Sequence, residues 1–183
     1  MGLALILQRQ NKFEESIPHM QAALNSQTSA FGRSNANTLK TLSALGTSLL
    51  WSGQLAEAEA TMLEALELGR RDLGPDHAET LTAVQNLAAL RLAQNDPAQA
   101  LALLSPIEEA TRNAFGTRKE AARFTLFLGS AHLRLKAYQS AEAYLLESRE
   151  LFDGVVDLDR LETDCRLALE ALYGAWKPSR TES

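Results

Sequence analysis

The residue types that most often support catalysis or bind metal ions are few and far apart in this sequence. The three histidines, His19, His77 and His132, have no partners at the spacing that a zinc site needs. The single cysteine, Cys165, has no histidine or aspartate arranged beside it as a nucleophile would require. No glycine-rich phosphate loop, serine-centred elbow or kinase signature is present. We therefore expect no enzymatic activity, no metal and no cofactor, and a buried structural thiol.

Composition and charge exclude further classes of protein. The formal net charge of −5 argues against a nucleic-acid-binding surface, which needs clustered cations, and against binding to anionic membranes. Apolar residues make up 45% of the chain and aromatic residues 6%, which is typical of a helix-rich protein with a continuous core. Residues 1–7 are apolar but too few to span a bilayer, and no basic flank precedes them as in a signal peptide. We expect a cytoplasmic protein.

Turn residues recur at a fixed interval along the chain. Gly32, Gly74 and Gly116 are spaced by 42 residues. After Gly74, a proline and Asp76 are typical of a tight turn in which Asp76 caps the next helix, and Glu79 is placed to complete a capping box. A constant interval of this length predicts a repeat protein.

Each repeat is predicted to be a pair of antiparallel helices that cross at a small residue. Two helices approach closely only where side chains are small, and the short turn between them must tolerate unusual φ angles. A bulky replacement at the crossing should therefore overpack it. The crossing residues, spaced by 42, 42 and 41, are Ala4, Gly46, Ala88 and Gly129, and a turn follows each of them at Asn11, Gly53, Asn95 and Lys136.

Apolar periodicity and capping residues predict where the helices lie. Asp96 and Pro97 are suited to begin one helix, and Pro106 is expected to kink it. Thr117 and Glu120 are expected to form another capping box. No strand pattern is present, so the expected fold class is all-α. The predicted helices cover about residues 13–27, 35–51, 55–71, 77–94, 97–113, 117–135, 138–152 and 157–175, after the last part of a first helix in residues 1–10.

The pattern of small and turn-forming residues resembles the tetratricopeptide repeat (TPR). In one unit the residues that fit it are Gly46, Gly53, Leu55, Ala58 and Ala65. The 42-residue spacing and the signature from Gly74 to Ala88 are similar to the kinesin-light-chain variety, and residues 172–178 resemble the last helix of bacterial arrays, some of which follow a serine/threonine kinase domain. The resemblance implies a single right-handed α-solenoid domain over residues 1–176, with repeats at about 1–30, 31–72, 73–114 and 115–153, a capping helix at about 157–175, and a flexible tail at 177–183.

A TPR array implies a concave face formed by the first helix of each pair. Asn86 is the clearest position, since an asparagine there commonly bonds a peptide backbone in such repeats. The amides, cations and aromatics on this face suit an extended or helical peptide with acidic character. The implied peptide or partner contacts are Lys40, Ser43, Thr47, Trp51, Thr82, Gln85, Asn86, Arg123, Phe127, Ser130 and Arg134.

Several interpretations of these residues stay open. Trp51 and Phe127 suit peptide anchors and interhelix packing equally, and the cations suit a carboxylate clamp or simple solvation. The expected function is protein–protein interaction. The alternatives are a regulatory or sensing domain of a larger, kinase-type protein, and a structural module that forms homodimers through the solenoid ends. Replacing Asn86 by Ala together with Arg123 by Glu is expected to abolish partner capture with little loss of stability.

Overall fold

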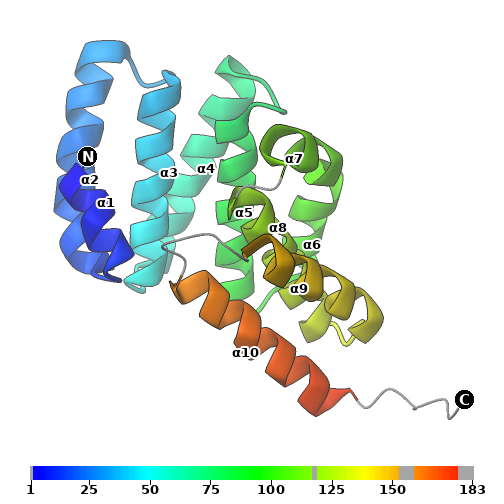
Figure 1. The fold of residues 1–183 in the computed structure, drawn as a ribbon. Helices are drawn as coiled ribbons and strands as arrows, with labels where there is room; N and C mark the ends of the chain where they lie inside the picture. Colours follow the sequence, from blue (N-terminus) through cyan, green and yellow to red (C-terminus); the bar gives the residue numbers. More distant parts are fainter. Residues whose placement is uncertain (1, 117–118, 153–158, 177–183) are drawn as a thin grey trace, which may run out of the picture.

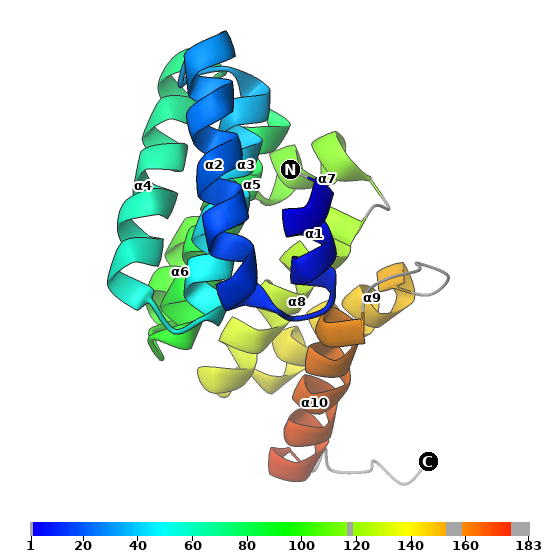
Figure 2. The same ribbon diagram turned by 90° about the vertical axis from the view of Figure 1, so that its left-hand side faces the viewer.

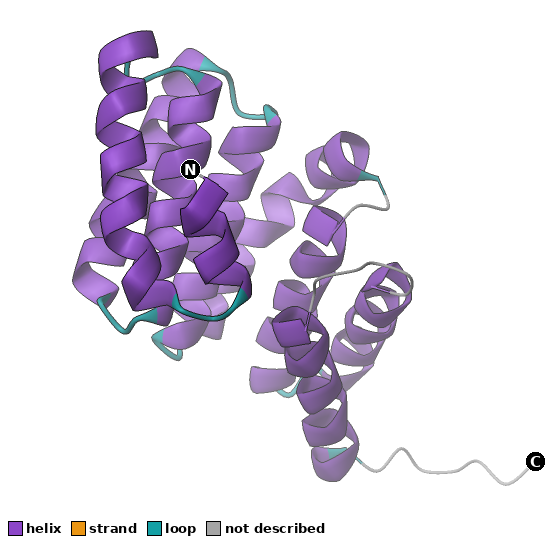
Figure 3. Ribbon diagram, turned by 60° about the vertical axis from the view of Figure 1, so that its left-hand side comes forward, coloured by secondary structure: helices purple, strands orange, loops and turns teal. Residues whose placement is uncertain are grey.

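The computed structural model describes residues 2–116, 119–152 and 159–176, and all regular structure in these ranges is helical (Figures 1 and 3). This confirms the all-α prediction. No helix in the described ranges has both the length and the apolar character needed to cross a bilayer. The helices are α1 (Gly2–Arg9), α2 (Phe13–Phe31), α3 (Ala36–Trp51), α4 (Leu55–Asp72), α5 (Ala78–Ala93), α6 (Pro97–Leu104), the 3₁₀ helix η1 (Ser105–Ile107), α7 (Glu108–Phe115), α8 (Lys119–Arg134), α9 (Tyr138–Phe152) and α10 (Asp159–Ala175).

The helices pack in consecutive pairs that lie side by side (Figures 1 and 2). Helix α1 packs against α2, α3 against α4, α5 against α6, and α8 against α9. The first helices of the pairs also meet, because α3 contacts α5 and α5 contacts α8. Gln8 Nε2 donates a hydrogen bond of 2.9 Å to the carbonyl oxygen of Ala44, which connects α1 to α3. We call α1, α3, α5 and α8 the inner row.

The two helices of each pair cross at the small residues predicted from the sequence. Ala4 and Ala88 are fully buried. A Cβ added to Gly46 would lie 2.9 Å from Cγ of Met62, and one added to Gly129 would lie 2.7 Å from Cγ of Leu145. Both distances are below van der Waals contact, so the helices are as close as a residue without a side chain allows.

The turns inside the pairs share one backbone conformation. Asn11, Gly53, Asn95 and Lys136 all have positive φ angles, of 57°, 83°, 59° and 61°. The left-handed region suits glycine and asparagine and is unfavourable for lysine. The prediction that these four corresponding positions need an unusual φ is confirmed.

The start of α5 differs from the sequence prediction. The capping residue is His77 rather than Asp76: the His77 Nδ1 atom accepts a hydrogen bond from the Glu79 backbone N–H at 3.2 Å. The helix begins one residue later than predicted, so the extended residue just before it supplies the cap. Asn35 caps α3 in the same way, by accepting from the Asn37 N–H. The capping box proposed for Thr117 lies outside the described residues.

Pro106 breaks the predicted helix over residues 97–113, where the sequence predicts only a kink. The segment divides into α6, η1 and α7, with Pro106 inside the 3₁₀ turn. Proline lacks the N–H that would bond to the preceding turn, which explains the break. The predicted start of this segment is confirmed, since Asp96 Oδ1 accepts from the Gln99 N–H at 3.0 Å and Pro97 is the first helical residue.

We expect Gly129→Ala to destabilise the protein by ~1–3 kcal/mol, the usual cost of overpacking. The new methyl group would also lie 3.1 Å from the backbone nitrogen of Leu145, which a side-chain rotation cannot move away. Gly46→Ala should cost less, because its neighbour is a flexible methionine and the gain in helix propensity is ~1 kcal/mol. Urea unfolding of both variants measures the difference, and equal stabilities would contradict this account of the crossings.

Candidate partner-binding site

Two adjacent hollows lie along the inner row. The first, which we call the polar hollow, has a volume of about 270 Å³ and is formed by residues of α3, α5 and α8 with Gln8 of α1 and Phe115 of α7. The second, the Trp51 hollow, has a volume of about 400 Å³. The structure therefore brings together ten of the eleven predicted contact residues: Lys40, Ser43, Thr47, Thr82, Asn86 and Arg123 in the polar hollow, and Trp51, Phe127, Ser130 and Arg134 in the Trp51 hollow.

The polar side chains of the polar hollow follow from helical spacing. Lys40, Ser43 and Thr47 lie three and four residues apart on α3, and so share one face of that helix. Thr82 and Asn86 repeat this spacing on α5. Because the first helices of the pairs stand side by side, these faces line a common surface.

Asn86 connects two neighbouring repeats. Its Nδ2 donates a hydrogen bond of 3.3 Å to the carbonyl oxygen of Ser43, and its side chain is only 4% exposed. The Ser43 hydroxyl, also buried, has no hydrogen-bond partner among the described residues. The amide of Asn86 thus holds α5 against α3, and its contact with a peptide backbone stays a prediction.

Arg123 and Gln85 form a second link between repeats. Nε and Nη2 of Arg123 donate to Oε1 of Gln85 at 3.2 and 3.0 Å, and the Gln85 side chain is fully buried. Burial lowers the pKa of the Arg123 guanidinium. Gln85 therefore lies beneath the surface of the inner row rather than on it, and Arg123 is fixed in place by Gln85.

The inner row is locally richer in cations than the chain as a whole. Burial raises the pKa of the Glu79 carboxyl, against the opposing effect of Lys40. The chain as a whole has a net charge of −5, yet positive groups outnumber negative ones in the lining of the two hollows. The inner-row residues that line the two hollows include the cations Lys40, Lys119, Arg123 and Arg134 and the carboxylates Glu79 and Glu120, whereas α10 adds one charge of each sign, Arg160 and Asp164.

The Trp51 hollow is apolar and has α10 as one of its walls. Phe127 is 8% exposed and belongs to the core, which favours packing as its role. Arg134 Nη1 donates to the carbonyl oxygen of Leu92. Trp51 is half-buried, with its ring 6.4 Å from the ring of Phe13.

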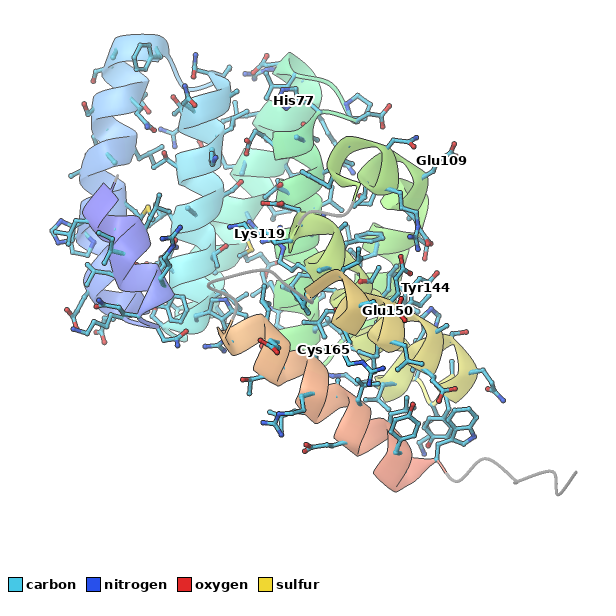
Figure 4. The ribbon with its side chains drawn as sticks, viewed as in Figure 1. His77, Glu109, Lys119, Tyr144, Glu150 and Cys165 are labelled. Carbon is cyan, nitrogen blue, oxygen red and sulfur yellow. The ribbon has the colours of Figure 1, made fainter. Side chains whose placement is uncertain are left out.

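Sequence reasoning missed two groups of lining residues. Lys119 lies four residues before Arg123 on α8, so helical spacing alone could have placed it in the polar hollow (Figure 4). Arg160 and Asp164 belong to α10, and nothing in the sequence indicates that this helix lies against the inner row.

His132 and Cys165 are both packed between helices. The ring of His132 on α8 stacks on that of Tyr144 on α9 with a centroid distance of 5.6 Å. Cys165 is buried between α9 and α10, where its thiol donates to the Leu145 carbonyl oxygen at 3.4 Å (Figure 4). Burial raises the pKa of this thiol, which disfavours the reactive thiolate. In the described ranges, no group of three or more His, Cys, Asp or Glu side chains is placed to hold a metal ion.

Removing Arg123 should cost stability, contrary to the expectation from sequence. Arg123→Met leaves the buried Oε1 of Gln85 without its donor, a loss of ~1–3 kcal/mol. Adding Gln85→Leu removes the stranded acceptor and should restore much of that loss. Lys40→Ala, an exposed change, should stay within ~0.5 kcal/mol of wild type. Thermal unfolding measures all three, and a fully stable Arg123→Met variant would refute the link.

Two family models, both described as tetratricopeptide repeat, match the chain at residues 38–105 and 86–155. A search of curated proteins gave no match. Together the two matches cover nearly all of α3 and the whole of α4 to α9, and therefore most of the inner row. The matches agree with the stacked helix pairs and with the small residues at their crossings. The chain is a tetratricopeptide repeat protein.

Proposed function

We propose that this protein binds an acidic peptide segment of another protein along its inner row. TPR repeats are in general protein–protein interaction modules. The excess of cations over carboxylates in the two hollows is the observation that supports an acidic ligand. The polar side chains there are held by bonds between repeats, so a ligand would lose little additional entropy by ordering them. An affinity of 1 μM would correspond to ~8 kcal/mol.

The finer classification is part of this proposal. The 42-residue spacing supports a relation to the kinesin-light-chain variety, and a non-catalytic, cytoplasmic protein fits this function. The alternative of a regulatory or sensing domain in a larger, kinase-type protein uses the same surface, with the ligand supplied by that larger protein. A single solenoid domain with the four repeats given above is compatible with either form.

Self-association is a second candidate function, favoured by exposed apolar side chains at one end of the stack. Leu3 and Ile6 of α1 are 54% and 50% exposed. Such a surface is prone to association with another protein. We expect a homodimer, if one forms, to dissociate when both residues are changed to Gln. Sedimentation equilibrium tests this, and a wild-type monomer at ~100 μM, well above micromolar affinity, would remove the candidate.

The proposed function is tested with a defined peptide library. Twelve-residue peptides rich in Asp and Glu, and matched peptides rich in Lys and Arg, are displayed and selected for binding. We expect acidic sequences to be enriched, with affinities that fall as salt rises, because screening weakens exposed charge contacts. Lys40→Glu and Lys119→Glu should each weaken a selected peptide about five- to tenfold, on the order of 1 kcal/mol.

Arg70→Glu is the matched control. Arg70 is exposed on α4, outside the inner row, and the replacement changes the net charge by the same amount. Its affinity for the selected peptide should equal that of wild type. If all three variants lose affinity equally, binding depends on net charge alone, and the inner row is not the site.

A further inference from the structure

The first turn of α10 reaches across the inner row to the first repeats of the array. The guanidinium carbon of Arg160 lies 3.7 Å from the ring centroid of Trp51 at the end of α3. It also lies 5.5 Å from the ring of Phe13, the first residue of α2. A cation close to two aromatic rings is a favourable arrangement. Figure 1 shows α10 starting beside the lower end of α3 and running towards α9.

This end of α10 forms one wall of the Trp51 hollow with one face of the helix. Arg160, Asp164, Leu167 and Ala168 line the hollow, and their spacing of four, seven and eight residues places them on the same side. Opposite them are the predicted partner contacts Trp51, Phe127, Ser130 and Arg134. An amphipathic helix bound in a groove presents its side chains in this way.

The rest of α10 is attached more firmly, and to a different surface. Cys165, Leu169 and Leu172 are buried, and α10 packs against α9. Trp176 stacks on Tyr138 at the start of α9, with ring centroids 6.0 Å apart. By contrast Leu167 is 49% exposed, and the ion pair between Arg160 and Asp164 is long, at 3.8 Å. The two ends of α10 therefore differ in how strongly they are held.

We propose that residues 160–164, at the start of α10, are an intramolecular ligand of the inner row. Arg160 holds them against Trp51 and Phe13, and a partner that extends into the Trp51 hollow displaces them while the remainder of α10 stays on α9. Because this segment belongs to the same chain, its effective concentration at Trp51 is high. We therefore expect a partner to bind the polar hollow first and to compete with the segment afterwards. The displacement step rests on the proposed function, whereas the contact of Arg160 with Trp51 does not.

The contact between the start of α10 and Trp51 is tested in the full chain with a tryptophan reporter. Trp176→Phe keeps an aromatic ring on Tyr138 and leaves Trp51 as the single tryptophan. In this background, Arg160→Ala should raise acrylamide quenching of Trp51 several-fold. Amide hydrogen exchange at residues 160–168 should become about tenfold faster, with residues 169–175 unchanged. Arg160→Lys keeps the positive charge but loses the planar group that stacks on the ring. Its Trp51 quenching and amide exchange should lie between those of wild type and those of Arg160→Ala.

Arg166→Ala is the matched control, because Arg166 lies on the same helix and pairs with Glu170 of its own helix rather than with an aromatic ring. It should leave Trp51 quenching and the exchange of residues 160–168 as in wild type. Equal quenching in the Arg160→Ala and Arg166→Ala variants would overturn the proposal. So would faster exchange along the whole of α10, which would mean that the helix opens as one unit.

The displacement step has its own readout. An acidic peptide selected on the wild-type chain should bind the Arg160→Ala variant about fivefold more tightly, and the Arg166→Ala variant with wild-type affinity. Unchanged affinity in the Arg160→Ala variant would refute the competition between peptide and α10. If no peptide binds the wild-type chain at all, the proposed function fails, while quenching and hydrogen exchange still decide whether Arg160 holds the start of α10 on Trp51.

Discussion

The close crossing of the two helices in each pair is the constraint on which the rest of the structure depends. At Gly129 and Gly46 there is no room for a side chain, and Ala4 and Ala88 are fully buried. Mid-helix glycine is otherwise unfavourable by ~1 kcal/mol relative to alanine, so packing rather than propensity explains these residues. The crossings fix the register between helices, and the register determines which face of each first helix is turned to the inner row.

Polar side chains of the inner row hold the repeats together as well as lining the hollows. Asn86 bonds to the backbone of α3, Arg123 to Gln85, and Gln8 to the backbone of α3. These bonds make the surface rigid, and they also mean that several implied ligand contacts are already bonded within the chain. The exposed cations Lys40 and Lys119 are better placed to meet a partner directly. The Trp51 hollow is bounded on one side by α10, so the inner row presents a polar hollow without α10 residues and an apolar hollow with α10 as one wall.

Local rules in the sequence predicted the helices, their crossings and their left-handed turns, because each depends on residues close together in the chain. His77 rather than Asp76 caps α5 because the helix begins one residue later than predicted. Helix propensities and capping preferences do not fix the first residue of a helix to within one position. The resemblance to the TPR implied which side chains share the inner row, and regular helical spacing explains why they lie on one face of each helix. The sequence did not predict that Gln85 is buried beneath Arg123, or that Arg160 lies on Trp51, because both depend on the distance between helices far apart in the chain.

The most direct test of the central claim is a residue-by-residue map of where an acidic peptide binds. Amide chemical-shift changes of the isotope-labelled chain, titrated with a library-selected peptide, give that map in solution. The account predicts changes concentrated on α3, α5 and α8 around Lys40, Thr82 and Lys119, with further changes in the first turns of α10. Changes confined to α2, α4 and α9, with the inner row unaffected, would contradict it.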